Sequence, residues 1–286
     1  MKNNIIWLAS YPKSGNTWFR SFLTALLNQG EIDINKMETD GIFSAKEYIE
    51  SILDLSTDDL RPREFESLRK TAFSYKAQLA QKELFVKIHD AYTFSRWDGL
   101  PLIPNKGSRL ALYLVRNPLD VVLSLANHTG LSIDETIDKY MNCEEGAFVK
   151  KGKAGQQYYQ LMGTWAMHAS SWMQQKDVPV HVIRYEDMKM NAFATFKTAV
   201  EKMQLNYSDD AIRKAIEATD FKKLKQQEEN KGFKEKAIPS SAFFFKGETG
   251  RWKKELTKEQ IQKIMTVNES MMKRLGYWEE VINQIQ

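Results

Sequence analysis

The chain has 286 residues, of which 42% are hydrophobic and seven are tryptophan, enough apolar material for the core of one α/β domain spanning residues 1–286. Its 41 basic and 37 acidic residues give a net charge of +4, which favours an anionic ligand but is too small for a nucleic-acid-binding face. The lone Cys143 excludes an intrachain disulfide, and no residue cluster indicates a metal site. Because no apolar run has the length of a signal-sequence core or a membrane span, we expect a cytoplasmic protein without a membrane partner.

A phosphate-binding loop is predicted near the start of the chain. Residues 5–9 form an apolar run of strand length, and from residue 19 apolar side chains recur at helical spacing. Between them lies the sequence Ser10-Tyr11-Pro12-Lys13-Ser14-Gly15-Asn16-Thr17-Trp18. Unpaired N–H groups and the helix dipole make such a junction an anion site, to which Lys13 adds a cation. In the Walker loop a lysine stands where this chain has Asn16, so a ligand other than a nucleoside triphosphate is indicated.

The rest of the chain alternates predicted strands and helices. Strands are expected at 84–89, 110–115 and 180–185, and helices near 63–81, 118–128 and 156–175. Helical patterns dominate after residue 186, with an interruption at 232–250. The stretch 31–63 is polar and mixed, and 90–108 is expected to be a long functional loop. This alternation implies a parallel sheet covered on both faces, whose ligands lie at the carboxyl ends of the strands.

Two groups at these strand ends could bind or activate a substrate. Arg116 and Ser124 are spaced to reach one anion, although a surface arginine capping the sheet is the alternative. His89, two residues after Lys87, is the best candidate for a general base, although a neighbouring carbonyl could equally satisfy its ring. His128 is the nearest rival as base.

The remaining candidates have weaker signals. His168 and His181 lie in apolar patterns and are expected in the core. Trp18 could stack on a base, or it could simply be buried. The segment 243–252 has two glycines that permit close approach to a ligand, or it is an ordinary loop anchored by phenylalanines. No serine–histidine–acid signature supports covalent catalysis.

Taken together, these motifs resemble those of the cytosolic-type sulfotransferases. Residues 11–18 match the family's Tyr-Pro-Lys-Ser-Gly-Thr-Thr-Trp with one change, and residues 116–124 match Arg-Asn-Pro-x-Asp-x-x-x-Ser in full. Residues 87–89 match Lys-x-His, and residues 185–188 match Tyr-Glu-Asp-Met. Residues 163–172 and 246–253 match two further family segments, so the matches cover residues 5–257 in the family's order. The family fold is a single domain with a central parallel sheet flanked by helices and a P-loop-like loop after the first strand.

The resemblance implies a donor, 3'-phosphoadenylyl sulfate (PAPS), and a product, 3',5'-adenosine bisphosphate, with no metal. The 5'-phosphate would lie against Lys13, Ser14, Gly15, Asn16 and Thr17. The adenine would contact Trp18, Tyr185, Thr219 and Phe221. The 3'-phosphate, which distinguishes this donor from ATP, would be bound by Arg116, Ser124, Lys246 and Gly247.

The same resemblance implies the catalytic residues. His89 would deprotonate a hydroxyl or amine of a small-molecule acceptor, and Lys13 would stabilise charge on the departing phosphate oxygen. Lys87 would assist at the sulfuryl group, and Ser124 is counted with these catalytic residues. The reaction would be a direct in-line transfer, in which positioning and electrostatics supply most of the rate.

The chain departs from the family at three places. Phe245 replaces an arginine that contacts the 3'-phosphate, a loss for which Arg251 is the nearest replacement. Asn16 replaces a threonine but keeps hydrogen-bonding capacity. The C-terminal dimer motif is only half present, which leaves the oligomeric state open. Two alternatives remain, a P-loop nucleotide or small-molecule kinase and a non-catalytic nucleotide-binding protein.

Overall fold

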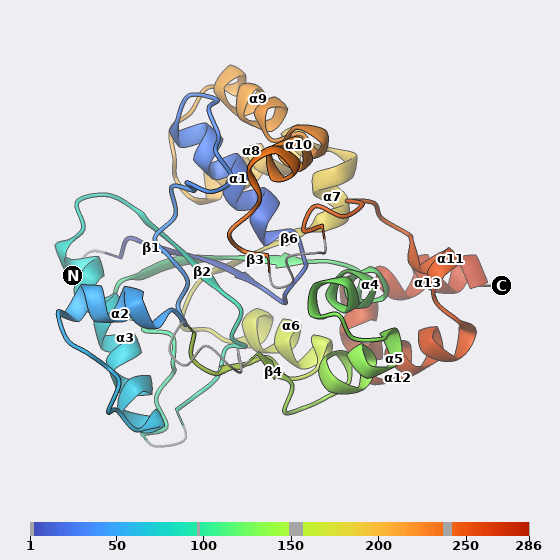
Figure 1. The fold of residues 1–286 in the computed structure, drawn as a ribbon, viewed down its shortest axis with the longest axis horizontal. Helices are drawn as coiled ribbons and strands as arrows, with labels where there is room; N and C mark the ends of the chain where they lie inside the picture. The colour runs from blue at the N-terminus through green and yellow to red at the C-terminus, as the bar shows by residue number, and fades with distance from the viewer. Residues whose placement is uncertain (1–2, 96–97, 149–156, 237–241, 286) are drawn as a thin grey trace.

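A four-stranded parallel sheet lies at the centre of the computed structural model, which describes residues 3–95, 98–148, 157–236 and 242–285 (Figure 1). The strand order is β2-β1-β3-β6, with bounds β1 (Ile5–Ser10), β2 (Leu84–Ile88), β3 (Ser108–Val115) and β6 (Val180–Arg184). The predicted strands and their parallel arrangement are therefore confirmed. Because all four strands are parallel, the segments that follow them begin at the same edge of the sheet.

Successive residues of each strand belong to different sides of the core. Trp7 packs on one face of the sheet together with Val86 and Tyr113. Leu8 packs on the other face, in a cluster with Leu112. This alternation explains why the strands read as continuous apolar runs, since both faces are covered.

The helices fall into two layers, as Figure 1 shows. One face carries α1 (Asn16–Leu27), α8 (Ala192–Lys202), α9 (Asp209–Ala218) and α10 (Phe221–Lys231). The other carries α2 (Lys46–Leu53), α3 (Pro62–Leu79), α4 (Pro118–Thr129), α5 (Ile133–Thr136), α6 (Trp165–Gln174) and α12 (Lys258–Arg274). The remaining helices are η1 (Ile137–Met141), α7 (Tyr185–Met190), α11 (Trp252–Glu255) and α13 (Tyr277–Ile285).

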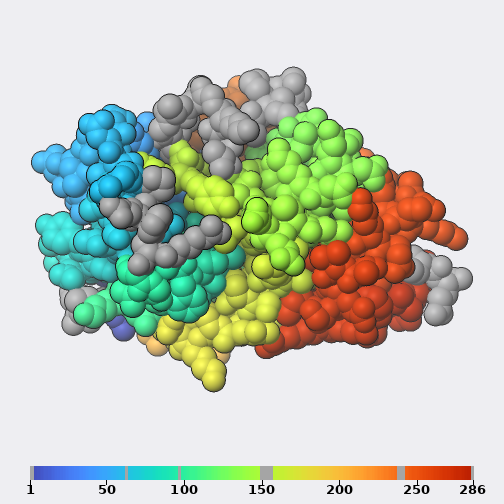
Figure 2. Space-filling view, turned by 90° about the horizontal axis from the view of Figure 1, so that it is seen from below, coloured from blue at the N-terminus to red at the C-terminus, as the bar shows by residue number. Residues whose placement is uncertain are grey.

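The structure corrects two expectations about the covering layer. The polar stretch 31–63 contains helix α2, which had not been predicted. The helix expected at 156–175 begins only at Trp165, and residue 156 lies outside the described residues. Ahead of α6 in the chain, β4 (Ala147–Phe148) and β5 (Gln160–Leu161) pair as a short antiparallel ladder. Figure 2 shows residues 157–175, in yellow-green, between the blue-to-cyan α2–α3 region and the green and red helices.

Candidate active site

The loop between β1 and α1 has the backbone geometry of an anion cradle. Lys13 and Gly15 have positive φ values of 69° and 97°, which turn the chain sharply into the helix. No side chain of the described residues caps the first turn of α1, so its N–H groups remain available to a ligand. A Cβ built on Gly15 would lie 2.7 Å from the ring of Tyr185, so the glycine is required both by its φ and by this close approach.

Asn16, which stands at the Walker lysine position, is anchored to the strand behind it. Its amide Nδ2 donates to the carbonyl of Leu8 at 2.8 Å and to the hydroxyl of Ser10 at 3.2 Å. The side chain is 4% exposed. The departure from the family motif therefore leaves a residue that ties the start of the helix to the end of β1.

A single cavity of about 750 Å³ collects most of the predicted site residues. Those that line it are Lys13, Gly15, Asn16, Thr17, Trp18, Lys87, His89, Arg116, Ser124, Tyr185, Phe221, Lys246 and Gly247. Two predicted residues are buried beside it and are not among the lining residues, Ser14 and Thr219. The hydroxyl of Thr219 donates to the carbonyl of Ala215 at 2.9 Å, within its own helix.

Arg116 reaches the cavity from the end of β3 and is held by backbone groups of two distant loops. Its guanidinium donates to the carbonyl of Glu248 at 2.6 Å and lies near that of Lys13 at 3.4 Å. It also stacks 4.4 Å from the ring centre of Tyr185, whose hydroxyl donates to the carbonyl of Gly247 at 3.1 Å. The alternative interpretation of Arg116, a surface arginine that caps the sheet, is wrong, because the residue is only 6% exposed.

The polar residues at the start of helix α4 each make a defined contact. The side chain of Asn117 accepts the N–H of Leu119 and so caps α4, and Pro118 follows as the first helical residue. The carboxylate of Asp120 accepts the N–H groups of Gly250 and Trp252 at 2.6 and 3.2 Å. The motif therefore also anchors the C-terminal loop that closes the cavity.

His89 lies just past β2, and its ring is oriented by β1. Its Nδ1 lies 2.8 Å from the carbonyl oxygen of Ser10. Since a carbonyl can only accept, this contact fixes the proton on Nδ1 and leaves the lone pair of Nε2 free. Burial and the nearby charge of Lys87 hold the pKa of His89 well below its ordinary value, so the ring is neutral at physiological pH.

The two histidines that were expected in the core differ in their burial. His168 is fully buried, as predicted, and its two ring nitrogens contact the hydroxyl of Tyr113 at 2.9 Å and the carbonyl of His89 at 3.1 Å. His181 is only half-buried, so its placement in the core was wrong. The rival base His128 lines the same cavity from the last turn of α4.

The ammonium group of Lys13 has a strongly lowered pKa. Desolvation, together with the positive charges of Lys87 and Arg116, lowers the pKa of Lys13 to about 7. Its ammonium lies 3.9 Å from the ring centre of Phe243. The amine is therefore close to half protonated at neutral pH while no anion is bound.

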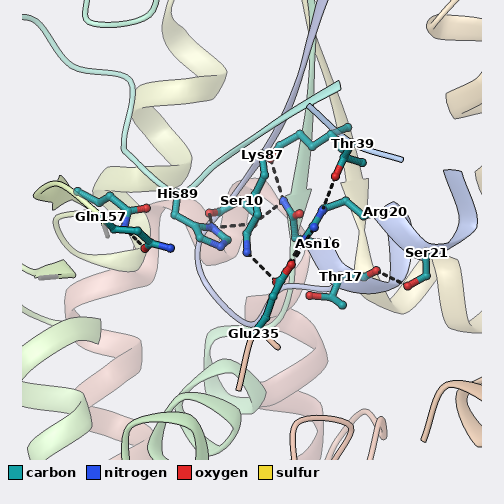
Figure 3. Close-up of polar contacts among 12 residues, drawn as sticks. Ser10, Asn16, Thr17, Arg20, Ser21, Thr39, Lys87, His89, Gln157 and Glu235 are labelled. Carbon is teal, nitrogen blue, oxygen red and sulfur yellow. Dashed lines mark hydrogen bonds and ion pairs between the residues drawn. The ribbon is translucent and has the colours of Figure 1, made fainter. Parts of the chain in front are cut away.

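Sequence reasoning missed an acidic residue at the centre of this site. Glu235 bridges two cations, accepting from Arg20 at 2.8 and 3.1 Å and from Lys87 at 3.1 Å (Figure 3). Burial alone would raise the pKa of Glu235, but Lys87 and Arg20 hold it well below its ordinary range. Arg20 and Glu235 lie 215 positions apart, and neither belongs to a motif, so no local pattern could have paired them.

The family arginine replaced by Phe245 is not restored by a free cation. Phe245 lines the cavity and is 41% exposed. Arg251 also lines it, but its guanidinium pairs with Glu255 at 2.7 Å, and Lys246 pairs with the same carboxylate at 3.0 Å. Glu255 thus holds two of the cations expected near the 3'-phosphate.

The comparisons with known proteins agree with this geometry. The family model described as the sulfotransferase domain matches residues 3–276. The chain belongs to the sulfotransferase domain family. It is 27% identical to sulfotransferase 1E1 of Bos taurus over 93% of this chain and 82% of that protein. It is 24% identical to cytosolic sulfotransferase 17 of Arabidopsis thaliana over 96% of this chain and 76% of that protein.

Two solved structures share the fold of this sulfotransferase. Retinol dehydratase, solved with androsterone and the inactive cofactor PAP, superposes with a TM-score of 0.60 at 17% identity, covering 96% of this chain and 82% of that one. Mouse sulfotransferase SULT7A1, solved with PAP, gives 0.57 at 19% identity, covering 95% and 86%. In the described residues, no helix of this chain is long and apolar enough to cross a membrane. The same residues hold no cluster of three or more histidine, cysteine or acidic side chains that could bind a metal ion.

Proposed function

We propose that this sulfotransferase moves the sulfuryl group of PAPS to a hydroxyl or amine of a small-molecule acceptor, with His89 as the general base. The observation that carries the proposal is the position of His89 in the same cavity as the phosphate loop and Arg116. PAP is bound in the solved structures of retinol dehydratase and SULT7A1, which share the fold. A sulfotransferase sequence and a site of this geometry favour the same nucleotide here.

Each phosphate of the donor has cations or N–H donors facing it. The 5'-phosphate would accept from the first turn of α1 and from Lys13, where free N–H groups and the helix dipole coincide. The 3'-phosphate would lie against Arg116 and Ser124, which line the cavity from β3 and α4. Trp18, Tyr185 and Phe221 supply aromatic faces for the adenine.

The transfer needs one proton to move. As the acceptor oxygen bonds to sulfur, its proton passes to the free Nε2 of His89, and the bond from sulfur to the bridging phosphate oxygen breaks. The leaving oxygen takes the electron pair, and Lys13 stabilises its charge. Lys87 would face the sulfuryl oxygens, where its ammonium now meets Glu235 at 3.1 Å.

The donor assignment is tested by thermal unfolding with 3',5'-adenosine bisphosphate and with ATP and Mg²⁺. The bisphosphate should raise the midpoint temperature more, because Arg116 and Ser124 recognise a 3'-phosphate that ATP lacks. Greater stabilisation by ATP would favour the kinase alternative and would overturn the proposal.

The base assignment is tested by His89→Ala, with His128→Ala as the matched control from the same cavity. His89→Ala should lower the transfer rate by about 10²–10⁴-fold. Stabilisation by the bisphosphate should remain, because the phosphate loop is untouched. Transfer by His89→Ala near the wild-type rate, with loss in His128→Ala, would move the role to His128.

A further inference from the structure

Two amide side chains belong to the part of the cavity that would receive an organic acceptor. Gln157 and Gln160 line the cavity, and so does the apolar Phe148, which pairs with Gln160 between β4 and β5. In Figure 3, Gln157 lies on the side of His89 that faces away from the cluster of Arg20 and Glu235. The two glutamines come from the segment around β5.

One polar atom of this wall is buried and unused. Gln160 is 3% exposed, and its Nε2 donates to the Oε1 of Gln157 at 3.2 Å. The Oε1 of Gln160 has no hydrogen-bond partner in the part of the chain that the structure describes. An amide oxygen buried without a partner carries a desolvation penalty of about 1–3 kcal/mol, which a ligand donor that reaches it from the cavity would remove.

The backbone holds this wall firmly against the strand that carries His89. Phe43 donates its N–H to the carbonyl of Lys87 at 2.9 Å, and Tyr158 donates to the carbonyl of Ser44 at 2.9 Å. On the other side of the histidine, Ala91 donates to the carbonyl of Leu161 at 2.8 Å. Gln157 and Gln160 therefore project from backbone that is tied to both flanks of His89.

We infer that Gln160 is a specificity-determining residue, whose amide oxygen accepts a hydrogen bond from a donor group of the acceptor other than the reacting one. The acceptors of this enzyme are then polyhydroxylated or amino-bearing compounds, and monohydric apolar alcohols are poor acceptors. Gln157 positions the amide by accepting its N–H at 3.2 Å. The inference rests on the proposed function and names its acceptor class.

The magnitude follows from the discrimination that a buried hydrogen-bonding group provides. A site built to pair a substrate donor rejects an analogue that lacks it, because the protein group is then left buried and unpaired. For a neutral pair the penalty corresponds to about 5- to 150-fold in affinity. An acceptor with a second hydroxyl in reach of Gln160 should exceed its monohydric analogue by a factor in this range.

The test uses 2-naphthol, the positional isomers of dihydroxynaphthalene and the monomethyl ether of each isomer. The ethers keep the second oxygen but cannot donate from it. Dissociation constants are measured by calorimetry with 3',5'-adenosine bisphosphate present, and kcat/KM is measured with PAPS. The proteins are wild type, Gln160→Met, Gln160→Glu and Gln262→Met, the last being the same change on the exposed face of α12.

We expect at least one diol to bind wild type about fivefold or more tighter than both 2-naphthol and its own ether. Gln160→Met should abolish this preference, whereas Gln160→Glu, which keeps an acceptor oxygen, and Gln262→Met should retain it. A wild-type protein without such a preference, or a preference that survives in Gln160→Met, overturns the inference. Binding of the bisphosphate tests the proposed function separately. If wild type did not bind it, the donor assignment would be refuted, whereas the acceptor preference would not be.

Discussion

The buried ammonium of Lys13 gives the donor site a pH dependence that can be measured without any acceptor. Desolvation and the charges of Lys87 and Arg116 lower the pKa of Lys13 to about 7 in the unliganded site. A bound phosphate favours the charged form, so the pKa of Lys13 rises when the bisphosphate binds. Above pH 7 binding must therefore take up a proton, and the affinity should fall as the pH increases.

The size of the effect follows from the fraction of Lys13 that is charged. About half of the amine is protonated at pH 7 and about 1% at pH 9, so the apparent dissociation constant should rise roughly 50-fold, or about 2.3 kcal/mol. His89 stays neutral across this window, because its pKa is lowered well below the ordinary value. The ligand's phosphates are also fully ionised there, since their second pKa lies near 6.

Calorimetric titration in buffers of different ionisation enthalpy measures both the affinity and the protons taken up. Wild type should take up about 0.9 proton per bound bisphosphate at pH 8. Lys13→Arg is the matched control, because a guanidinium keeps its charge throughout the window, and its affinity should change by less than about threefold. A flat profile in wild type, or an equal slope in Lys13→Arg, would refute the argument.

Two further substitutions test how the scaffold holds the site. Gly15→Ala should weaken bisphosphate binding at least about tenfold and lower the free energy of unfolding by about 1–3 kcal/mol, because a Cβ there has a positive φ and meets the ring of Tyr185. Gly99→Ala is the control for binding, because a Cβ at Gly99 meets no atom within 4 Å, and it should leave bisphosphate binding intact. Arg69 forms a buried ion pair with Asp90 at 3.1 Å, so Arg69→Met should lower the free energy of unfolding by about 3–5 kcal/mol, because it leaves the carboxylate of Asp90 without its partner at a position only 2% exposed. Arg61→Met, which removes an exposed pair with Glu64, is the control, and equal effects of the two in denaturant unfolding would contradict the role of burial.

The sheet was predictable because its strands are buried on both faces. Each is an apolar run whose alternating residues enter two clusters, and such runs are distinguishable from helices by their length. Helix α2 escaped prediction because Ile49 is its only fully buried residue, so the apolar stripe is too thin to stand out. The two-residue strands β4 and β5 carry no periodicity at all.

The site was predictable where its residues belong to motifs that begin or end a strand. The loop after β1, the His89 segment and Arg116 were each found in this way, because parallel strands deliver their ends to one edge. Glu235 and Gln160 were not found. Glu235 meets Arg20 only through the tertiary fold, and it lies in the interruption of the helical pattern at 232–250. Gln160 lies in a stretch whose spacing predicted a helix, whereas the structure has the two-residue strand β5 there.

The contact between His89 and the carbonyl of Ser10 has a consequence for how such an enzyme can change its substrate. Strands β1 and β2 are adjacent and in fixed register, with Ala9 opposite Ile88, so the spacing between the phosphate loop and His89 is set by the pairing of the strands and by the contact to Ser10. The side chain of Gln160 comes from a different segment, around β5, and takes no part in this spacing. The side chains of that segment can be exchanged to suit a new acceptor while the reacting atoms keep their alignment.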